Sequence, residues 1–377
     1  MLRLGLATAV MALVLALGSE SAAGLWGRAM DNEPPACRHS QVEVCRGLTR
    51  QKDLLGHLRR IMQPYWTSLP DQPTATQFIE ISRNATQSAE DSVYELTLVT
   101  RDQQRAELDA AKTAIIAFLK SSSDRRRLFD GPDGARRLER LVDRLDAVTL
   151  RYGREWVESA AAEMHGEREG PGRRPHRARA WLDYHETCGR EGDREEMFTS
   201  SFIARDGLGA PAGPDGEGIV PCPGLVLGLA DYAADREDIP PALQFFLGLQ
   251  LGQIITAETA DIWAPETQLK ACYGEDFVLD VGAQSAAGVN PDPAQVASTL
   301  AAQCWGGFTL GRRLGEIDSV SRRVRVAALA LQPHCQNLKQ APPAIRRWLM
   351  HHIGLVPTLA AQLSNAAPAL DQPYCAA

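Results

Sequence analysis

The sequence lacks most of the short motifs that mark a known chemistry. It contains no CxxC pair, so neither a zinc ribbon nor a thioredoxin-like site is supported. It contains no GxSxG, and its spacing suggests no Ser/His/Asp or Cys/His grouping. The Gly/Pro-rich loop at 206–218 lacks the GxxxxGKS/T pattern, so it has no predicted phosphate role.

Later apolar runs and an excess of basic residues are also absent. No stretch after the N-terminal segment reaches about 18 uninterrupted apolar residues, so we expect no transmembrane segment after signal cleavage. The formal net charge is −7 and the pI is near 5.7, which argues against a nucleic-acid partner.

The first residues present a clear pattern. Arg3 precedes the apolar run at 4–17, and Ser21-Ala22-Ala23 offers a small-residue cleavage site. This pattern is typical of a secretory signal peptide over 1–23, with an uncleaved N-terminal anchor as the alternative. We therefore expect a secreted or periplasmic protein.

Cysteine usage fits that compartment. All eight cysteines follow the signal segment: Cys37, Cys45, Cys188, Cys222, Cys272, Cys304, Cys335 and Cys375. An even count in an exported chain predicts disulfides. Short separation suggests one pairing, Cys37 with Cys45.

Composition and the positions of Gly/Pro-rich stretches predict the division of the chain into domains. Hydrophobic residues make up 44% and charged residues 23%, as in a globular protein. After the signal peptide we expect these parts: a cysteine-bearing lead-in at 24–47, a helical domain at 48–164, a Gly/Pro-rich linker at 165–180, a second domain at 181–340 and C-terminal helices at 341–377.

Helical periodicity dominates the part at 48–164. Apolar residues from Leu48 onward predict a helix that ends at Pro64. The segment 88–122 favours one long helix, with VYELTLVT as a strand-like exception. The segment 134–164 places a leucine stripe opposite Arg and Glu, which is typical of a solvated, ion-paired helix face. These elements predict a helical bundle or hairpin.

The second domain centres on an almost wholly apolar helix. Its sequence, PPALQFFLGLQLGQIITAETADIW, is preceded by a short edge strand beginning at Ile219 and by Asp238, which can cap the helix. Pro265 is expected to end the helical run, and a further helix is expected at 295–310. Such an apolar helix is explained by burial alone.

Four motifs in order give this domain a further interpretation. The window 249–253, LQLGQ, stands where an HExxH motif would be, and DFVLDVGA follows with Asp276 and Asp280 in the positions of an ExxAD pattern. AAGVNPDPAQV and then SVSRRVRVAAL, which contains Arg325, come next. Over 198–331 this order resembles the M48-type metallopeptidases of the Ste24/HtpX group.

The resemblance implies a zincin-like domain with a small edge sheet, but its zinc ligands are replaced. Leu249 cannot bind zinc, Gln250 cannot act as a general base, and the amide of Gln253 is a poor ligand. Asp276 is a shortened third ligand. We therefore expect no catalytic residue and no zinc cofactor, and Asp276, Asp280 and Arg325 remain candidates for binding.

The expected fold is mainly α, of the α+β class. The expected function is that of an exported pseudopeptidase that binds a peptide or protein partner. One alternative is an active peptidase or hydrolase with a non-standard site, such as a carboxylate group formed by Glu258, Asp261, Asp276 and Asp280. Another is an envelope or secreted structural scaffold.

Overall fold

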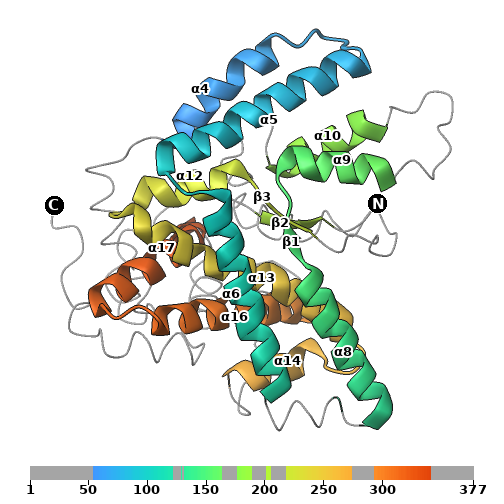
Figure 1. The fold of residues 1–377 in the computed structure, drawn as a ribbon, viewed down its shortest axis with the longest axis vertical. Helices are drawn as coiled ribbons and strands as arrows, with labels where there is room; N and C mark the ends of the chain where they lie inside the picture. The colour runs from blue at the N-terminus through green and yellow to red at the C-terminus, as the bar shows by residue number, and fades with distance from the viewer. Residues whose placement is uncertain are drawn as a thin grey trace.

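The protein is mainly helical and carries one small sheet, which confirms the predicted fold class (Figure 1). The computed structural model describes residues 54–121, 129, 131–163, 176–188, 201–204, 218–273 and 293–340. The predicted signal segment at 1–23, the lead-in at 24–47 with its Cys37–Cys45 pairing, and the C-terminal helices at 341–377 lie outside the described residues.

The elements fall into two stretches of chain. The first contains α4 (Leu54–Thr67), α5 (Ala75–Thr97), α6 (Arg101–Ser121), α8 (Gly131–Ala147), β1 (Thr149–Leu150), α9 (Gly153–Glu163) and α10 (His176–Cys188). The second contains β2 (Ser201–Ala204), β3 (Gly218–Pro221), α12 (Pro223–Tyr232), η4 (Arg236–Asp238), α13 (Ile239–Thr259), α14 (Pro265–Tyr273), α16 (Pro293–Gly315) and α17 (Val320–Gln340). In Figure 1, the α4–α5 hairpin and helix α8 lie at opposite ends of the molecule.

The sheet has the strand order β1–β3–β2. β1 pairs with β3 in parallel, with Thr149 opposite Gly218, and β2 pairs with β3 antiparallel, with Phe202 opposite Val220. The strand predicted at Ile219 is therefore present, but it is the central strand and not an edge strand. The two-residue strand β1, which covers its other side, comes from a segment predicted to be helical.

Helix α13 lies at the centre of the fold, and α6, α16 and α17 pack against it. It is apolar on nearly every face, so burial on all sides satisfies its composition. Its backbone approaches α16 very closely at two glycines. A Cβ atom on Gly248 would lie 2.9 Å from the carbonyl oxygen of Trp305, and one on Gly252 would lie 2.8 Å from that of Ala302. The small residues of this helix thus have a packing role.

A buried polar network joins three of these helices. The carboxylate of Glu107 on α6 accepts hydrogen bonds from Arg313 on α16, at 2.8 and 3.1 Å. Gln244 on α13 donates its Nε2 to Glu107 twice, to Oε2 at 2.7 Å and to the backbone oxygen at 2.6 Å. The buried charge of Glu107 is therefore paired and hydrogen-bonded, as a buried carboxylate requires.

One apolar core spans both predicted domains. Buried side chains from α4 to β1 and from β3 to α17 belong to the same cluster, for example Leu108, Ile115, Leu145, Phe245 and Leu310. The domain boundaries themselves remain predictions. None of the helices within the described ranges is long and apolar enough to cross a lipid bilayer.

The predicted long helix at 88–122 is wrong. The chain forms two helices, α5 and α6, which are separated at Leu98. Leu98 has a φ of 59° and ends α5, with its N–H bonded to the carbonyl of Tyr94. Thr100 then caps α6, because its hydroxyl accepts from the N–H of Gln103 while its own N–H donates to the Gln103 side chain.

Two proline predictions also need correction. Helix α4 continues through Pro64 to Thr67, and the carbonyl of Pro64 accepts the N–H of Ser68. The fixed φ of proline is compatible with a last helical turn, so the helix is not ended there. Pro265 does not end the preceding helix: α13 stops at Thr259, and Pro265 begins α14, where a missing N–H carries no penalty.

A disulfide joins Cys188 to Cys222, with a Cα–Cα distance of 5.3 Å. It connects the end of α10 to the residue between β3 and α12. A second apolar cluster, which includes Phe78, Trp181 and Tyr184, surrounds it. The expectation of disulfides in this chain is confirmed at this pair.

Candidate functional site

The window that resembles a zinc motif lies on α13, and its members have different surroundings. Leu249 is half-buried against the main core, Gln250 is buried and Gln253 is exposed. Leucine has no donor atom, and the two amides are poor zinc ligands, so these side chains do not fit the metal. Asp276 and Asp280 lie outside the described residues.

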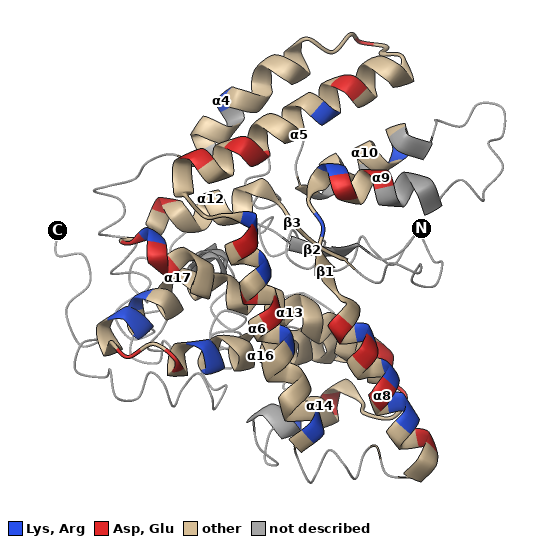
Figure 2. Ribbon diagram, in the orientation of Figure 1, with Lys and Arg blue, Asp and Glu red and all other residues tan. Residues whose placement is uncertain are grey.

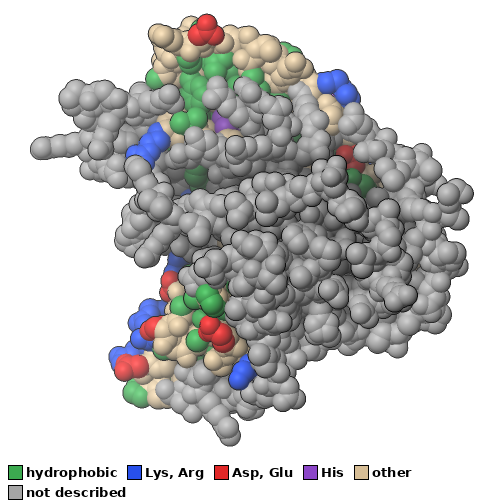
Figure 3. All heavy atoms as spheres, turned by 180° about the vertical axis from the view of Figure 1, so that it is seen from behind, with side chains coloured by type: hydrophobic (Ala, Val, Ile, Leu, Met, Phe, Trp, Pro, Cys, Tyr) green, Lys and Arg blue, Asp and Glu red, His purple; other side chains and the backbone are tan. Residues whose placement is uncertain are grey.

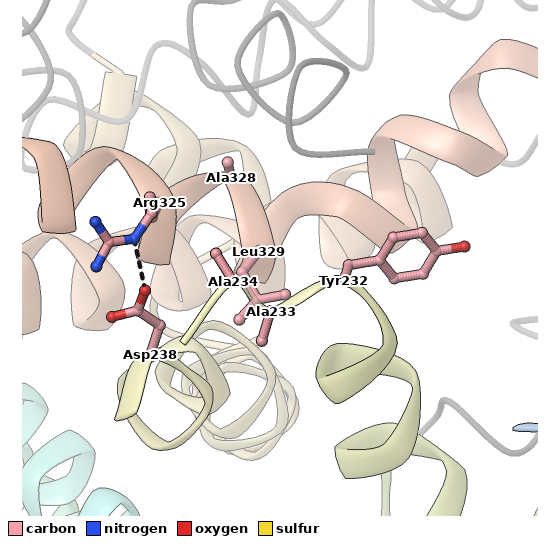
Figure 4. A pocket seen from close by; sticks show the side chains of 7 residues that line it. All are labelled: Tyr232, Ala233, Ala234, Asp238, Arg325, Ala328 and Leu329. Atoms are coloured by element: carbon pink, nitrogen blue, oxygen red, sulfur yellow. Dashed lines mark hydrogen bonds and ion pairs between the residues drawn. The ribbon is translucent and has the colours of Figure 1, made fainter. Parts of the chain in front are cut away.

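Arg325 on α17 is engaged with the start of α13. Its Nε donates to Asp238 at 2.9 Å (Figure 4). Arg322 Nε donates to the other carboxylate oxygen at 3.0 Å. Asp238 does occupy the N-cap position of α13, but its side chain makes no capping hydrogen bond, contrary to the prediction. The cavity beside Arg325 has a volume of about 10 Å³, which is about the space of one water molecule. Arg325 is therefore engaged in an ion pair with Asp238, and the cavity beside it has room for about one water molecule.

The carboxylates proposed as an alternative site are paired with another helix. Glu258 forms an ion pair with Arg144, and Asp261 with Arg137, both on α8. Figure 2 shows charges of both signs along α8, and the view from behind shows them gathered at that end of the molecule (Figure 3). Within the described ranges, no group of three or more His, Cys, Asp or Glu side chains could hold a metal ion.

A groove of about 500 Å³ lies elsewhere, where α5, α6 and α12 meet (Figure 1). We call it the α5–α6 groove. Its walls are the second half of α5, the first turn of α6, Tyr152 after β1, and residues within 221–226, from the end of β3 to the first turn of α12. Its volume is within the range of small-molecule and peptide side-chain sites, about 300–1,000 Å³.

The break between α5 and α6 shapes one rim of the groove. Tyr94 lines the groove with 54% of its surface exposed. Leu98, which precedes the groove-lining Val99, is 53% exposed. Leu98 adopts the left-handed conformation that disfavours every residue with a Cβ atom. An exposed aromatic side chain thus lines the groove close to a locally strained turn.

Glu90 is the buried carboxylate of the groove. Its side chain is 9% exposed and accepts from Arg101 Nη2 at 2.7 Å and from the N–H of Gly153 at 2.8 Å. Burial raises the pKa of Glu90 above its ordinary value, although Arg101 and the Gly153 N–H oppose this effect. A Cβ atom on Gly153 would lie 2.7 Å from both Thr86 and Tyr184, so no side chain fits at that position.

Arg101 is held between acidic and aromatic partners. Its guanidinium carbon lies 4.3 Å from the ring centroid of Tyr152, which is a cation–π distance. Its Nη1 lies 3.6 Å from Glu155. Burial raises the pKa of Tyr152, so this phenol stays neutral and serves as a surface for Arg101.

Gln104 lines the inner wall of the groove. Its side chain is 5% exposed, and its amide makes no hydrogen bond to any described residue. Its backbone N–H, by contrast, bonds normally to the Thr100 carbonyl within α6. An amide on the wall of a groove, with free donor and acceptor capacity, is the kind of group that a ligand can satisfy.

Sequence patterns did not point to this groove. Glu90 stands in a run of ordinary surface-like residues, and its partner Gly153 is 63 positions away. The one local signal was the T-x-x-Q spacing of Thr100 and Gln103, which predicts a new helix start and hence the break at Leu98.

Comparison of the chain with protein-family models, with curated protein sequences and with solved structures gives no match.

Proposed function

We propose that this chain is a peptide-binding protein without peptidase activity, and that the α5–α6 groove holds its partner. One observation carries the proposal: a groove of about 500 Å³ that is lined by the exposed aromatic side chain of Tyr94. Aromatic side chains at the edge of a cleft provide much of the binding energy in peptide and protein recognition.

The conformation of Leu98 supports the same site. An L-residue in the left-handed region costs about 1–2 kcal/mol. Leu98 adopts this conformation and also exposes an apolar side chain to water, which is a second unfavourable feature. Local strain of this kind concentrates at functional sites, where the geometry is needed for something other than stability. Glycine would adopt this conformation with less strain than leucine. The presence of a leucine therefore supports a role for the side chain in binding.

The absence of peptidase activity is proposed from residue chemistry. The positions that resemble the zinc motif carry Leu249, Gln250 and Gln253, and a catalytic zinc site needs three protein ligands. Descent from a metallopeptidase remains part of the proposal, and the order of the four motifs supports it. Action outside the cytoplasm is supported by the N-terminal segment 1–23 and by the Cys188–Cys222 disulfide.

The test is selection from a library of random dodecapeptides on the purified chain. We compare the wild type with Tyr94→Ala and with Val320→Ala, which removes another exposed apolar side chain away from the groove. We expect the wild type and Val320→Ala to enrich the same peptides, and Tyr94→Ala to bind them about tenfold more weakly. Failure to enrich any peptide, or equal binding by the two variants, would contradict the proposal.

A hydrolase with a non-standard site is the second candidate, and the raised pKa of Glu90 favours it. A carboxyl group with a raised pKa in a cleft can act as a general acid or base. Mass spectrometry of the enriched peptides after incubation distinguishes the two. Cleavage that Glu90→Gln abolishes indicates the hydrolase, whereas intact peptides indicate binding alone.

A further inference from the structure

We infer that the peptide held in the α5–α6 groove presents a basic side chain, Arg or Lys, to the exposed face of α5 formed by Asp91, Tyr94 and Glu95. This inference rests on the proposed function and specifies its ligand. Asp91 and Glu95 lie one helical turn apart on either side of the Tyr94 position, so all three share one face. Each of the three side chains is exposed and lines the groove.

Charge around the groove is unbalanced in favour of a cation. Of the described residues that line it, Glu90, Asp91 and Glu95 are acidic and Arg101 is basic. Figure 2 shows acidic positions, in red, along α5. Arg101 is neutralised by Glu90 and Glu155 within the protein. The charges of Asp91 and Glu95 therefore remain available to a ligand.

The end of α5 adds to the same preference. The carbonyl groups of the last helical turn carry partial negative charge, and the last turn of α5 contains no basic residue. The ring of Tyr94 offers a face on which a guanidinium or ammonium group can lie. The aromatic ring, the flanking carboxylates and the C-terminal end of the helix all favour a positively charged group on the ligand.

Gln104 independently points to a peptide. Its side chain is 5% exposed and lines the groove, and its amide has no hydrogen-bond partner among the described residues. An amide side chain can donate to a backbone carbonyl and accept from a backbone N–H at the same time. A ligand with peptide groups satisfies both, whereas a simple cation satisfies only the oxygen.

The experiment uses the peptides enriched by the wild-type chain and a neutral copy of each, in which arginine is replaced by citrulline. Citrulline keeps the shape of the side chain and removes its charge. Binding of fluorescein-labelled pairs is measured on the wild type, on Asp91→Asn/Glu95→Gln, and on Glu139→Gln/Asp143→Asn. The last variant makes the same charge change at the same spacing on exposed positions of α8.

We expect Arg or Lys to be enriched at one peptide position. Citrulline should weaken binding about tenfold on the wild type and on the α8 control, and less than about twofold on Asp91→Asn/Glu95→Gln. Enriched peptides without a basic residue, or an equal citrulline effect on all three proteins, would overturn the inference and leave peptide binding intact. Enrichment of acidic peptides would assign the groove to Arg101 instead. A library that yields no peptide removes the proposed function itself.

Discussion

Helix α6 carries two buried polar side chains one turn apart, and they are treated differently by the fold. Glu107 meets α13 and α16, where Gln244 and Arg313 occupy its carboxylate. Gln104 meets the groove, where its amide has no hydrogen bond to a described residue. In the first region a polar network joins the helices, whereas in the second the amide keeps hydrogen-bonding capacity that the proposed peptide would use. Both side chains are buried, so the two regions differ in whether the buried polar group has a hydrogen-bond partner within the protein.

The largest expected effect is in the structural region. Glu107→Leu leaves the half-buried Arg313 without the carboxylate that pairs with it, and it removes one of the two hydrogen bonds that the buried Gln244 makes to residue 107. We expect the free energy of unfolding to fall by about 3 kcal/mol, as when one member of a buried ion pair is removed. Urea denaturation measures this, with Glu139→Leu on the exposed face of α8 as a control within about 0.5 kcal/mol of wild type. A decrease in the free energy of unfolding of less than about 1 kcal/mol would mean that the Glu107 network contributes little to stability.

Two buried glutamines give the sharpest form of the comparison. Gln244 is 1% exposed and hydrogen-bonded to Glu107, while Gln104 is 5% exposed and has no such bond. Gln244→Leu should lower the unfolding free energy by about 2 kcal/mol, because two hydrogen bonds to Glu107 are lost. Gln104→Leu should leave stability unchanged or slightly raised, and should weaken peptide binding about tenfold. Equal destabilisation by the two substitutions would erase the distinction between the regions.

The turn at Leu98 offers a smaller effect of opposite sign. Leu98→Gly removes the left-handed strain of an L-residue, and the greater freedom of glycine in the unfolded chain offsets part of that gain. We expect the protein to become more stable by about 0.5 kcal/mol and to bind peptides less tightly. Leu98→Ala keeps the strain and serves as the matched control for loss of the side chain. A destabilised glycine variant would show that the leucine is there for the fold.

The smallest effect is the pH dependence of Glu90. Burial raises the native pKa of this carboxyl above the ordinary value of 4.5, so ionisation is harder in the folded than in the unfolded state. The stability that Glu90 contributes is therefore complete below the ordinary pKa and is lost as the pH rises through the native pKa. Measured at about pH 4 and about pH 7, the stability of wild type minus that of Glu90→Gln should fall with rising pH. A difference that grows instead would mean that the attraction of Arg101 exceeds the effect of burial.

Much of the helical architecture could be predicted from periodicity. The stripe that includes Leu141 and Leu145 gave a helix at α8, and the helix expected at 295–310 is α16, Pro293–Gly315. The break at Leu98 could not be found in the same way, because the stretch around it contains neither glycine nor proline. The strand β1 could not be found either, since two residues carry no period and their pairing with β3 is made by chain almost 70 positions away.

The candidate site was less predictable than the fold. Its central residues, Glu90 and Gln104, are polar side chains on amphipathic helices, and only distant contacts from Gly153 and from 221–226 bury them. The sequence directed attention to α13, where the window 249–253 of an apolar helix was interpreted as a lost zinc motif. In the folded protein Gly248 and Gly252 allow α16 to approach, so close packing alone accounts for part of that pattern.

Hydrogen–deuterium exchange of the whole chain, with and without a selected peptide, tests the central claim most directly. We expect the peptide to slow exchange at 90–104 and at 221–226, the two walls of the α5–α6 groove, and to leave 246–256 on α13 unchanged. Slower exchange at 246–256 with no change at 90–104 would contradict this account and return the binding site to the metallopeptidase-like window.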